Sequence, residues 1–163
     1  MAENIKQTDQ IQEHMQQPYN APPGIMANTL QVDIVSAEKE IFSGRAKAII
    51  VTGEDGELGI FPGHTQILSA IKPGYVCLID KANERHYYYV SGGFLEAQPD
   101  AVTILADTVL RADQIDQEKA LAAKERAEKM LATGKRLDDN YNMILIELTK
   151  AIAQLHVARN LRK

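Results

Sequence analysis

Hydrophobic and polar positions divide the chain into three stretches with different periods. Residues 1–25 follow neither the two-residue period of a strand nor the helical period, and they are rich in glutamine and proline. We expect a disordered leader, which is either native or an added extension in front of a natural start at Met26. A signal peptide would need a continuous apolar segment, and a transit peptide would be rich in arginine and poor in acids, so neither fits.

Residues 26–112 carry short apolar segments of the kind that form β-strands. Leu30, Val32 and Ile34 alternate with polar residues, which indicates a half-buried strand. Four more compact apolar runs follow, at residues 46–51, 75–79, 87–90 and 102–106. Turn residues bound these runs, among them Pro73-Gly74 before the second and Gly92-Gly93 after the third. The pattern predicts an all-β sandwich or barrel.

Residues 113–163 switch to helical spacing and predict two helices. The first helix is expected to run from an N-cap at Asp113 to about Thr133, with alanines along one face, and Gly134 is expected to end it. Asp138 or Asp139 can cap the second helix. Its predicted packing face consists of Tyr141, Leu145, Leu148, Ile152 and Leu155.

These two helices are expected to form an antiparallel hairpin with little core of its own. Each apolar side chain contributes only about 1.5–3 kcal/mol when fully buried, and the entropy of ordering offsets most of that gain. The hairpin should therefore rest on the β-domain. Its docked and undocked states should differ by only a few kcal/mol, which would make it a mobile element.

Composition excludes several classes of protein. The 163 residues suffice for one domain with an appendage. A net charge of −4 argues against a nucleic-acid binder. No apolar run approaches the ~20 residues of a membrane-spanning helix, so we expect membrane association only through partners. The sole cysteine, Cys77, excludes an internal disulfide and fits a reducing compartment.

The charge is unevenly distributed along the chain. Residues 1–25 carry a net charge of −2, residues 26–112 carry −4, and residues 113–163 carry +2. An acidic body with a mildly basic tail suits docking in a fixed orientation.

No motif in the sequence supports catalysis. The loop Gly53–His64 is rich in glycine but lacks the P-loop order, and its three acids would repel phosphate. It is either a pair of tight turns with Leu58, Ile60 and Phe61 directed inward or a partner-contact loop. The four histidines lack metal-site spacing, and Cys77 in its apolar strand is expected to be a buried, inert thiol.

Four motifs, in order, closely resemble the ε subunit of bacterial F-type ATP synthases. They are Glu57-Leu58-Gly59-Ile60-Phe61-Pro62-Gly63-His64, Ile71-Lys72-Pro73-Gly74, Val90-Ser91-Gly92-Gly93-Phe94-Leu95-Glu96 and Ile104-Leu105-Ala106-Asp107. The similarity continues through residues 150–155 and covers the chain from Met26 onward. The resemblance implies a β-sandwich of about ten strands, residues 26–112, followed by a regulatory α-helical hairpin, residues 113–163.

The resemblance also implies a function and partners. The family is a non-catalytic part of the central rotor stalk, at the cytoplasmic face of the bacterial inner membrane. Its sandwich binds subunit γ and rests on the c-ring, and by motif position Glu57 and His64 resemble the residues that face the c-ring. In this family the helices can leave the sandwich, extend along γ and insert among the α and β subunits, which suppresses ATP hydrolysis.

The basic side chains of the last helix and tail are the candidates for those inhibitory contacts. They are Lys150, Arg159, Arg162 and Lys163. On charge alone, they could equally serve only to stabilise the negative end of the helix dipole. Inhibition would be a shift in the population of docked and extended states.

The alternative function is a nucleotide sensor. Some family members bind ATP on the folded hairpin through an Ile/Leu-Asp-x-x-Arg-Ala motif and further arginines. Here Asp116 matches, Lys119 replaces the motif arginine, Arg126 matches a further arginine, and Lys150 and Gln154 replace two others. Lysine lacks the planar fork that grips phosphate, so ATP binding should be weak or absent. A free-standing adaptor unrelated to the synthase would have no affinity for γ.

Overall fold

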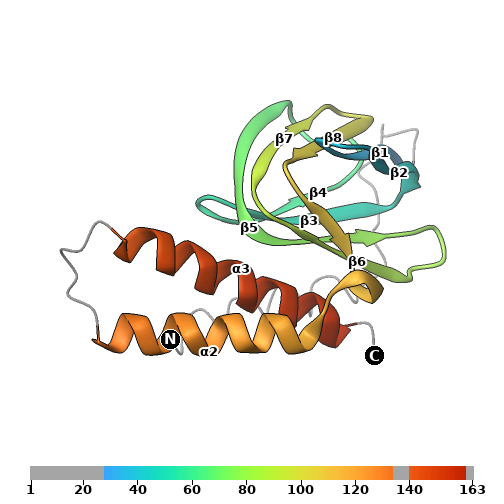
Figure 1. Cartoon of the computed structure of the whole chain (residues 1–163). Coiled ribbons are helices and arrows are strands. Elements are labelled where there is room, and N and C mark those ends of the chain that lie inside the picture. Colours follow the sequence, from blue (N-terminus) through green and yellow to red (C-terminus); the bar gives the residue numbers. More distant parts are fainter. Residues whose placement is uncertain (1–27, 134–139, 161–163) are drawn as a thin grey trace, which may run out of the picture.

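A computed structural model describes residues 28–133 and 140–160, which form nine strands, a 3-10 helix and two α-helices (Figure 1). In chain order they are β1 Leu30–Ser36, β2 Glu40–Ala46, β3 Ala48–Gly53, β4 Gly56–Ile60, β5 Ile67–Ile79, β6 Arg85–Val90, β7 Gly93–Ala97, β8 Ala101–Ala106, β9 Val109–Arg111, η1 Ala112–Gln114, α2 Gln117–Thr133 and α3 Tyr141–Asn160. The predicted leader, Gly134, Asp138, Asp139, Arg162 and Lys163 lie outside the described residues.

The nine strands confirm the predicted β-sandwich, and β5 belongs to both of its layers. The strand order is β2-β1-β8-β7-β5-β3-β4, with β6 on β5 and β9 on β6. The first half of β5 pairs with β7, and its second half pairs with β3 and β6. β1 and β8 run parallel, and the other described pairs are antiparallel.

Pro73-Gly74 was expected to precede the strand at residues 75–79, and this prediction is wrong. β5 continues through both residues, and the register with β3 shifts between the pairs Val51↔Val76 and Gly53↔Ile71. The N–H of Tyr75 donates to Oγ1 of Thr52 at 3.1 Å, so the Thr52 side chain lies directly over Gly74. The irregular register bends the strand, as bulges do, instead of ending it.

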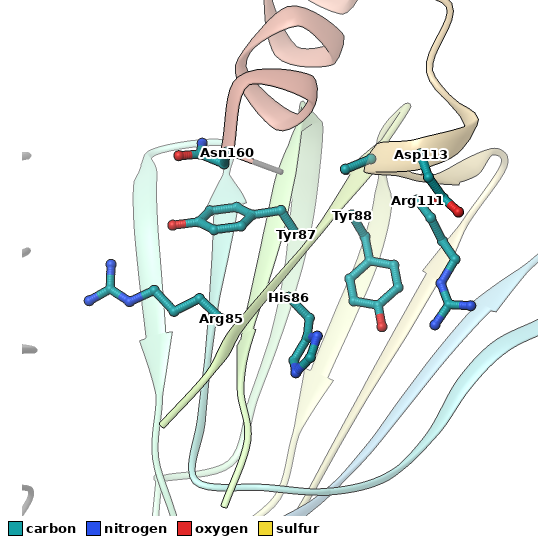
Figure 2. A pocket seen from close by; sticks show the side chains of 8 residues that line it. Arg85, His86, Tyr87, Tyr88, Arg111, Asp113 and Asn160 are labelled. Atoms are coloured by element: carbon teal, nitrogen blue, oxygen red, sulfur yellow. The ribbon is translucent and has the colours of Figure 1, made fainter. Parts of the chain in front are cut away.

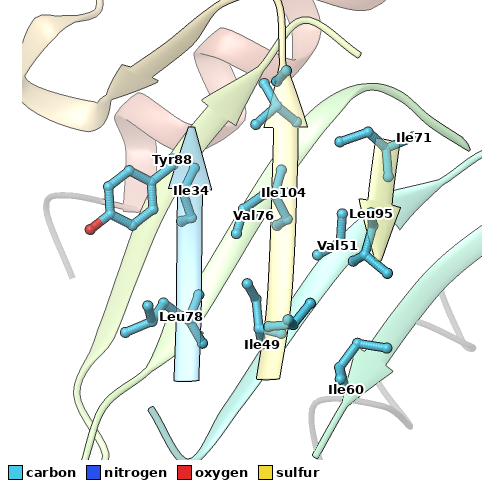
Figure 3. Packing of buried hydrophobic residues seen from close by; sticks show 14 of the residues in the cluster. Ile34, Ile49, Val51, Ile60, Ile71, Val76, Leu78, Tyr88, Leu95 and Ile104 are labelled. Atoms are coloured by element: carbon cyan, nitrogen blue, oxygen red, sulfur yellow. The ribbon is translucent and has the colours of Figure 1, made fainter. Parts of the chain in front are cut away.

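Alternation along the strands fills the space between the two layers with aliphatic side chains (Figure 3). Leu30, Val32 and Ile34 are fully buried, as the sequence predicted. Their partners from the parallel neighbour β8 include Val102 and Ile104, which are also fully buried. Cys77 lies on the other face of β5, with Tyr75, and is also buried, as the sequence predicted.

Helix α2 starts later than predicted. Asp113 belongs to the short 3-10 helix η1, and the α-helix begins at Gln117 and ends at Thr133. The carboxylate of Asp116 accepts the N–H of Lys119 at 3.1 Å, which is the bond expected of an N-cap. Among the described helices, none has the length and apolar character needed to cross a membrane.

The predicted packing face of α3 is wrong in part, because Tyr141, Leu148 and Leu155 are half-buried but the other two residues are exposed. Leu145 and Ile152 are 43% and 48% exposed, whereas the buried residues of α3 are Ala151, Ala153, Val157 and Ala158. On α2, Ala120 and Ala127 are buried, as expected for its alanine face. Small residues let the backbone of a helix approach its neighbour closely. A prediction based on large apolar residues therefore overlooks the alanines of α3 that pack against the neighbouring elements.

Candidate partner-binding surfaces

The helical hairpin rests on the sandwich through α3, which lies over β5 and β6 with α2 on its far side (Figure 1). The contact is a small apolar cluster, here called the docking cluster. Its buried members are Tyr89, Ala112, Ile115, Ala153, Val157 and Ala158, with Tyr75, Tyr87 and Leu110 packed around them. The hairpin therefore depends on the sandwich for part of its core, as the sequence predicted.

Tyrosines of the sheet make the specific contacts with α3. The ring of Tyr75 stacks on the imidazole of His156, with centroids 4.8 Å apart and planes 23° from parallel. The hydroxyl of Tyr75 donates a hydrogen bond to Oε1 of Glu57. Burial raises the pKa of Tyr75, and the bond to Glu57 raises it further, so the phenol remains a neutral donor.

Tyr89 makes a second polar contact with α3. Burial raises its pKa, and a side-chain hydrogen bond with Gln154 opposes that shift. Gln154 is one of the positions at which nucleotide-binding relatives of the resembled family carry arginine. In this chain the side chain faces the sheet and helps to hold the docked helix.

A second surface lies on the outer face of β5, β7 and β8 and was missed by the sequence analysis. Leu68, Phe94 and Leu105 are 73%, 57% and 54% exposed. Phe94 pairs directly with Leu105 on β8, and Leu68 on β5 pairs with Glu96, two residues beyond Phe94. These three residues are called the outer patch. Phe94 precedes Leu95 and Leu105 follows Ile104, and both Leu95 and Ile104 are fully buried. Because successive side chains of a strand point to opposite faces, Phe94 and Leu105 must face outward.

The two residues expected to face the c-ring occupy different environments. Glu57 lies on β4 and holds Tyr75, beside α3. His64 lies in the following loop, where the neighbouring N–H of Gly63 donates to the carbonyl of Pro99 at 2.6 Å. The reading of tight turns with inward side chains is confirmed, because Ile60 is fully buried and Leu58 and Phe61 are half-buried. A partner contact of this loop stays a prediction.

The described basic candidates of the last helix do not form one patch. Lys150 is half-buried in the middle of α3, and Arg159 is exposed in its last turn. They are nine positions apart, which at about 100° per residue places them on opposite sides of the helix. Lys150 and Arg159 would therefore contact different partner surfaces.

The nucleotide candidates have local partners. Besides its cap bond, Asp116 has its Oδ2 3.7 Å from Nζ of Lys119, and Arg126 is exposed on α2. A groove near the end of α3 has none of these three among its lining residues (Figure 2). Within that groove Arg85 and Arg111 point to different sides of Tyr87 and Tyr88, so their guanidinium groups do not converge on one ligand.

The turn between β5 and β6 brings His86 to Asp80, a pairing that the sequence analysis did not find. Oδ2 of Asp80 lies 2.9 Å from Nε2 of His86, and its Oδ1 accepts the N–H groups of Ala82 and Glu84. The bond to His86 and these backbone bonds lower the pKa of Asp80. Asn83 takes a left-handed conformation with φ of 66°. Asp80 thus stabilises the turn that holds β5 against β6.

Comparison with known families identifies the chain. Residues 29–112 match the beta-sandwich domain of the ATP synthase delta/epsilon chain, and residues 113–159 match the long alpha-helix domain of the same chain. The chain belongs to this family. It is therefore a non-catalytic subunit of an ATP synthase.

A solved structure shares the fold of this delta/epsilon chain, and a second one shows a weaker similarity. A chain from the Euglena gracilis mitochondrial ATP synthase, in a structure of OSCP, F1 and c-ring, superposes with a TM-score of 0.70 at 21% identity, covering 86% of this chain and 89% of that one. A chain from the central stalk and c-ring of the Tetrahymena thermophila mitochondrial enzyme gives 0.47 at 12% identity, with 82% and 96% covered.

Proposed function

We propose that this delta/epsilon chain is a rotor subunit of the central stalk, which binds γ through the outer patch and restrains ATP hydrolysis through its helices. The proposed contact with γ is supported by the outer patch, which is an exposed apolar surface on the sheet. The similar Euglena chain comes from an assembly that contains F1 and a c-ring, which agrees with a position of this chain in the central stalk. Association with a membrane would then come only through the complex.

The outer patch has the properties of a permanent protein contact. Phe94 and Leu105 are cross-strand neighbours, and Leu68 lies diagonally beside Phe94 on its other side. Burying an apolar side chain of this size contributes about 1.5–3 kcal/mol, and contiguous exposed apolar surface on a folded domain marks an interaction site. We assign the patch to γ, because a rotor subunit must turn with γ and needs a firm contact.

Replacing Phe94 by aspartate should reduce the affinity for γ by at least about tenfold, because a charge in an apolar contact must be desolvated. The affinity is measured by pull-down and by calorimetry with purified γ. Leu121→Asp is the matched control, since Leu121 is an exposed apolar residue of α2, 47% accessible, outside the patch. Equal affinities of the two variants for γ would contradict the assignment.

The helices carry the regulatory part of the proposal. Met143, Leu145, Ile146 and Ile152 are all exposed large apolar residues of α3 in the docked hairpin. A second position of α3, among α, β and γ subunits, would bury them and offset the loss of the docking cluster. Each state then has a comparable apolar contact, which is the condition for a population shift.

Truncation after Ala112 should leave binding to γ intact and raise the ATP hydrolysis rate of the reconstituted synthase. The sandwich and the outer patch are retained, whereas the helices that would obstruct rotation are removed. Hydrolysis is measured with truncated and full-length chains at matched occupancy on γ, under both ADP-rich and ATP-rich conditions. An unchanged rate under both conditions would refute the regulatory half of the proposal.

Two finer parts of the assignment belong to this proposal as well. The motifs resemble the bacterial ε subunit, which would place the chain at the cytoplasmic face of an inner membrane. Glu57 and His64 are retained as candidates for the c-ring contact. Nucleotide sensing by Asp116, Lys119 and Arg126 stays a prediction.

A further inference from the structure

Three elements meet at Tyr75. Its hydroxyl is bonded to Glu57 on β4, its ring is stacked on His156 of α3, and its backbone belongs to β5. We propose that Tyr75 couples the occupancy of Glu57 by a partner to the docking of α3. When a cationic group of a partner binds Glu57, Tyr75 loses its acceptor and the helix is held less tightly. The identity of that partner rests on the proposed function, but the coupling itself does not.

The backbone of Tyr75 is fixed, so only its side chain can respond. Its N–H donates to Oγ1 of Thr52, and the same oxygen donates to its carbonyl at 3.3 Å. Thr52 in turn pairs with Glu57 in the β3–β4 ladder. The orientation of the phenol ring is therefore set by its side-chain contacts: the bond to Glu57, the stack on His156 and a tilted contact with the ring of Tyr87, 6.0 Å between centroids.

Glu57 is accessible to a partner while it holds Tyr75. It is only half-buried, and it lies in a hairpin whose turn residues Glu54 and Asp55 are exposed. A carboxylate in an acidic hairpin attracts a guanidinium or ammonium group. Such a group would compete directly with the phenol for the carboxylate oxygens.

Coupling of this kind is reciprocal. If the Tyr75–Glu57 bond favours the docked helix, then docking favours the bond by the same factor. Hydrogen bonds to charged groups are stronger than neutral ones, so we expect a factor of about three to ten in the docking equilibrium. Binding of a partner at Glu57 would then raise the undocked fraction of α3 by that factor.

Cys77 supplies a direct readout in the unmodified chain. It is the sole cysteine, and it lies two residues from Tyr75 on the same face of β5, the face that carries α3. It is 1% exposed, and burial raises its pKa to about 11. Modification by a maleimide therefore requires an opening of the structure, and because Cys77 shares its face of β5 with Tyr75 beneath α3, we expect the rate to rise with the undocked fraction.

The test measures the modification rate of Cys77 in the isolated full chain for Tyr75→Phe, Glu57→Ala and the double variant. Each single variant should raise the rate about three- to tenfold, because each removes the same hydrogen bond. The double variant should be no faster than the faster single one, since the bond can be lost only once. Glu54→Ala, an exposed acid of the same hairpin, should leave the rate unchanged.

Unchanged rates in the single variants, or a double variant whose rate is the product of both effects, would overturn the coupling. Urea unfolding of each variant separates local undocking from loss of the whole fold, because only the latter lowers the unfolding midpoint of the sandwich. The isolated chain needs no synthase for this measurement. A failure of the proposed γ contact or of the hydrolysis effect would appear in the experiments with γ and with the synthase, and it would leave the result for Cys77 unaffected.

Discussion

Replacing Gly93 by alanine should destabilise the sandwich by about 3–5 kcal/mol, a large part of the total stability of a domain this size. Gly93 opens β7 between two neighbouring strands and has φ of 143°. A Cβ atom there would lie 2.0 Å from the carbonyl oxygen of Leu105 and 2.8 Å from Cα of Ala106. Both contacts are with backbone, so no side chain can move aside.

Gly56→Ala is the matched control for this substitution. Gly56 has a similar φ of 137°, but nothing lies within 4 Å of a Cβ built there. This substitution should lower the free energy of unfolding only by the cost of the unfavourable backbone conformation, about 1–3 kcal/mol. Urea unfolding followed by circular dichroism gives both values. Equal losses for the two variants would show that the conformation, and not the close approach to β8, makes glycine necessary at residue 93.

Val157→Asp should detach the helical hairpin while the sandwich stays folded. Val157 is fully buried in the docking cluster. A buried carboxylate without a cationic partner costs several kcal/mol, which exceeds the few kcal/mol that a small apolar interface can supply. Cys77 should then react with maleimide at least about a hundredfold faster, the factor that corresponds to about 2.7 kcal/mol.

The controls for Val157→Asp lie on the same helix and in the same fold. Ile152→Asp places the same charge five residues earlier at an exposed position, and it should leave the Cys77 rate unchanged. Urea unfolding should show that the sandwich keeps most of its stability. If Val157→Asp unfolds sandwich and hairpin together, the two parts form one cooperative unit and the helices cannot leave as proposed.

The sequence predicted those parts of the fold in which local pattern and packing agree. Alternation at Leu30, Val32 and Ile34 located β1 and its buried face, because a strand in a sandwich has one side in the core. The helical spacing up to Thr133 was predicted as well, and α2 is helical through that residue. The start of this helix was misplaced because Asp113 and Asp116 are equally good caps locally, and the 3-10 helix η1 decides between them.

The remaining errors come from contacts that a local pattern does not contain. Pro73-Gly74 has the chemistry of a turn, but pairing with β3, β6 and β7 on either side keeps β5 continuous. The buried face of α3 is set by the fit of Ala153 and Val157 on the tyrosines of the sheet. Hydrophobic periodicity favours large residues such as Leu145 and Ile152, which are the ones left exposed.

The continuity of β5 has a mechanical consequence for a subunit that turns with a rotor. Leu68 of the outer patch lies near the start of this strand, and Tyr75 lies in its second half beneath α3. Seven residues of extended chain span roughly 20 Å between them. Ladder hydrogen bonds run across the strand, so a load along β5 is shared among many of them at once. If γ binds the outer patch as proposed, a load applied there would reach the docked helices through this one strand and through the bend at its register shift with β3.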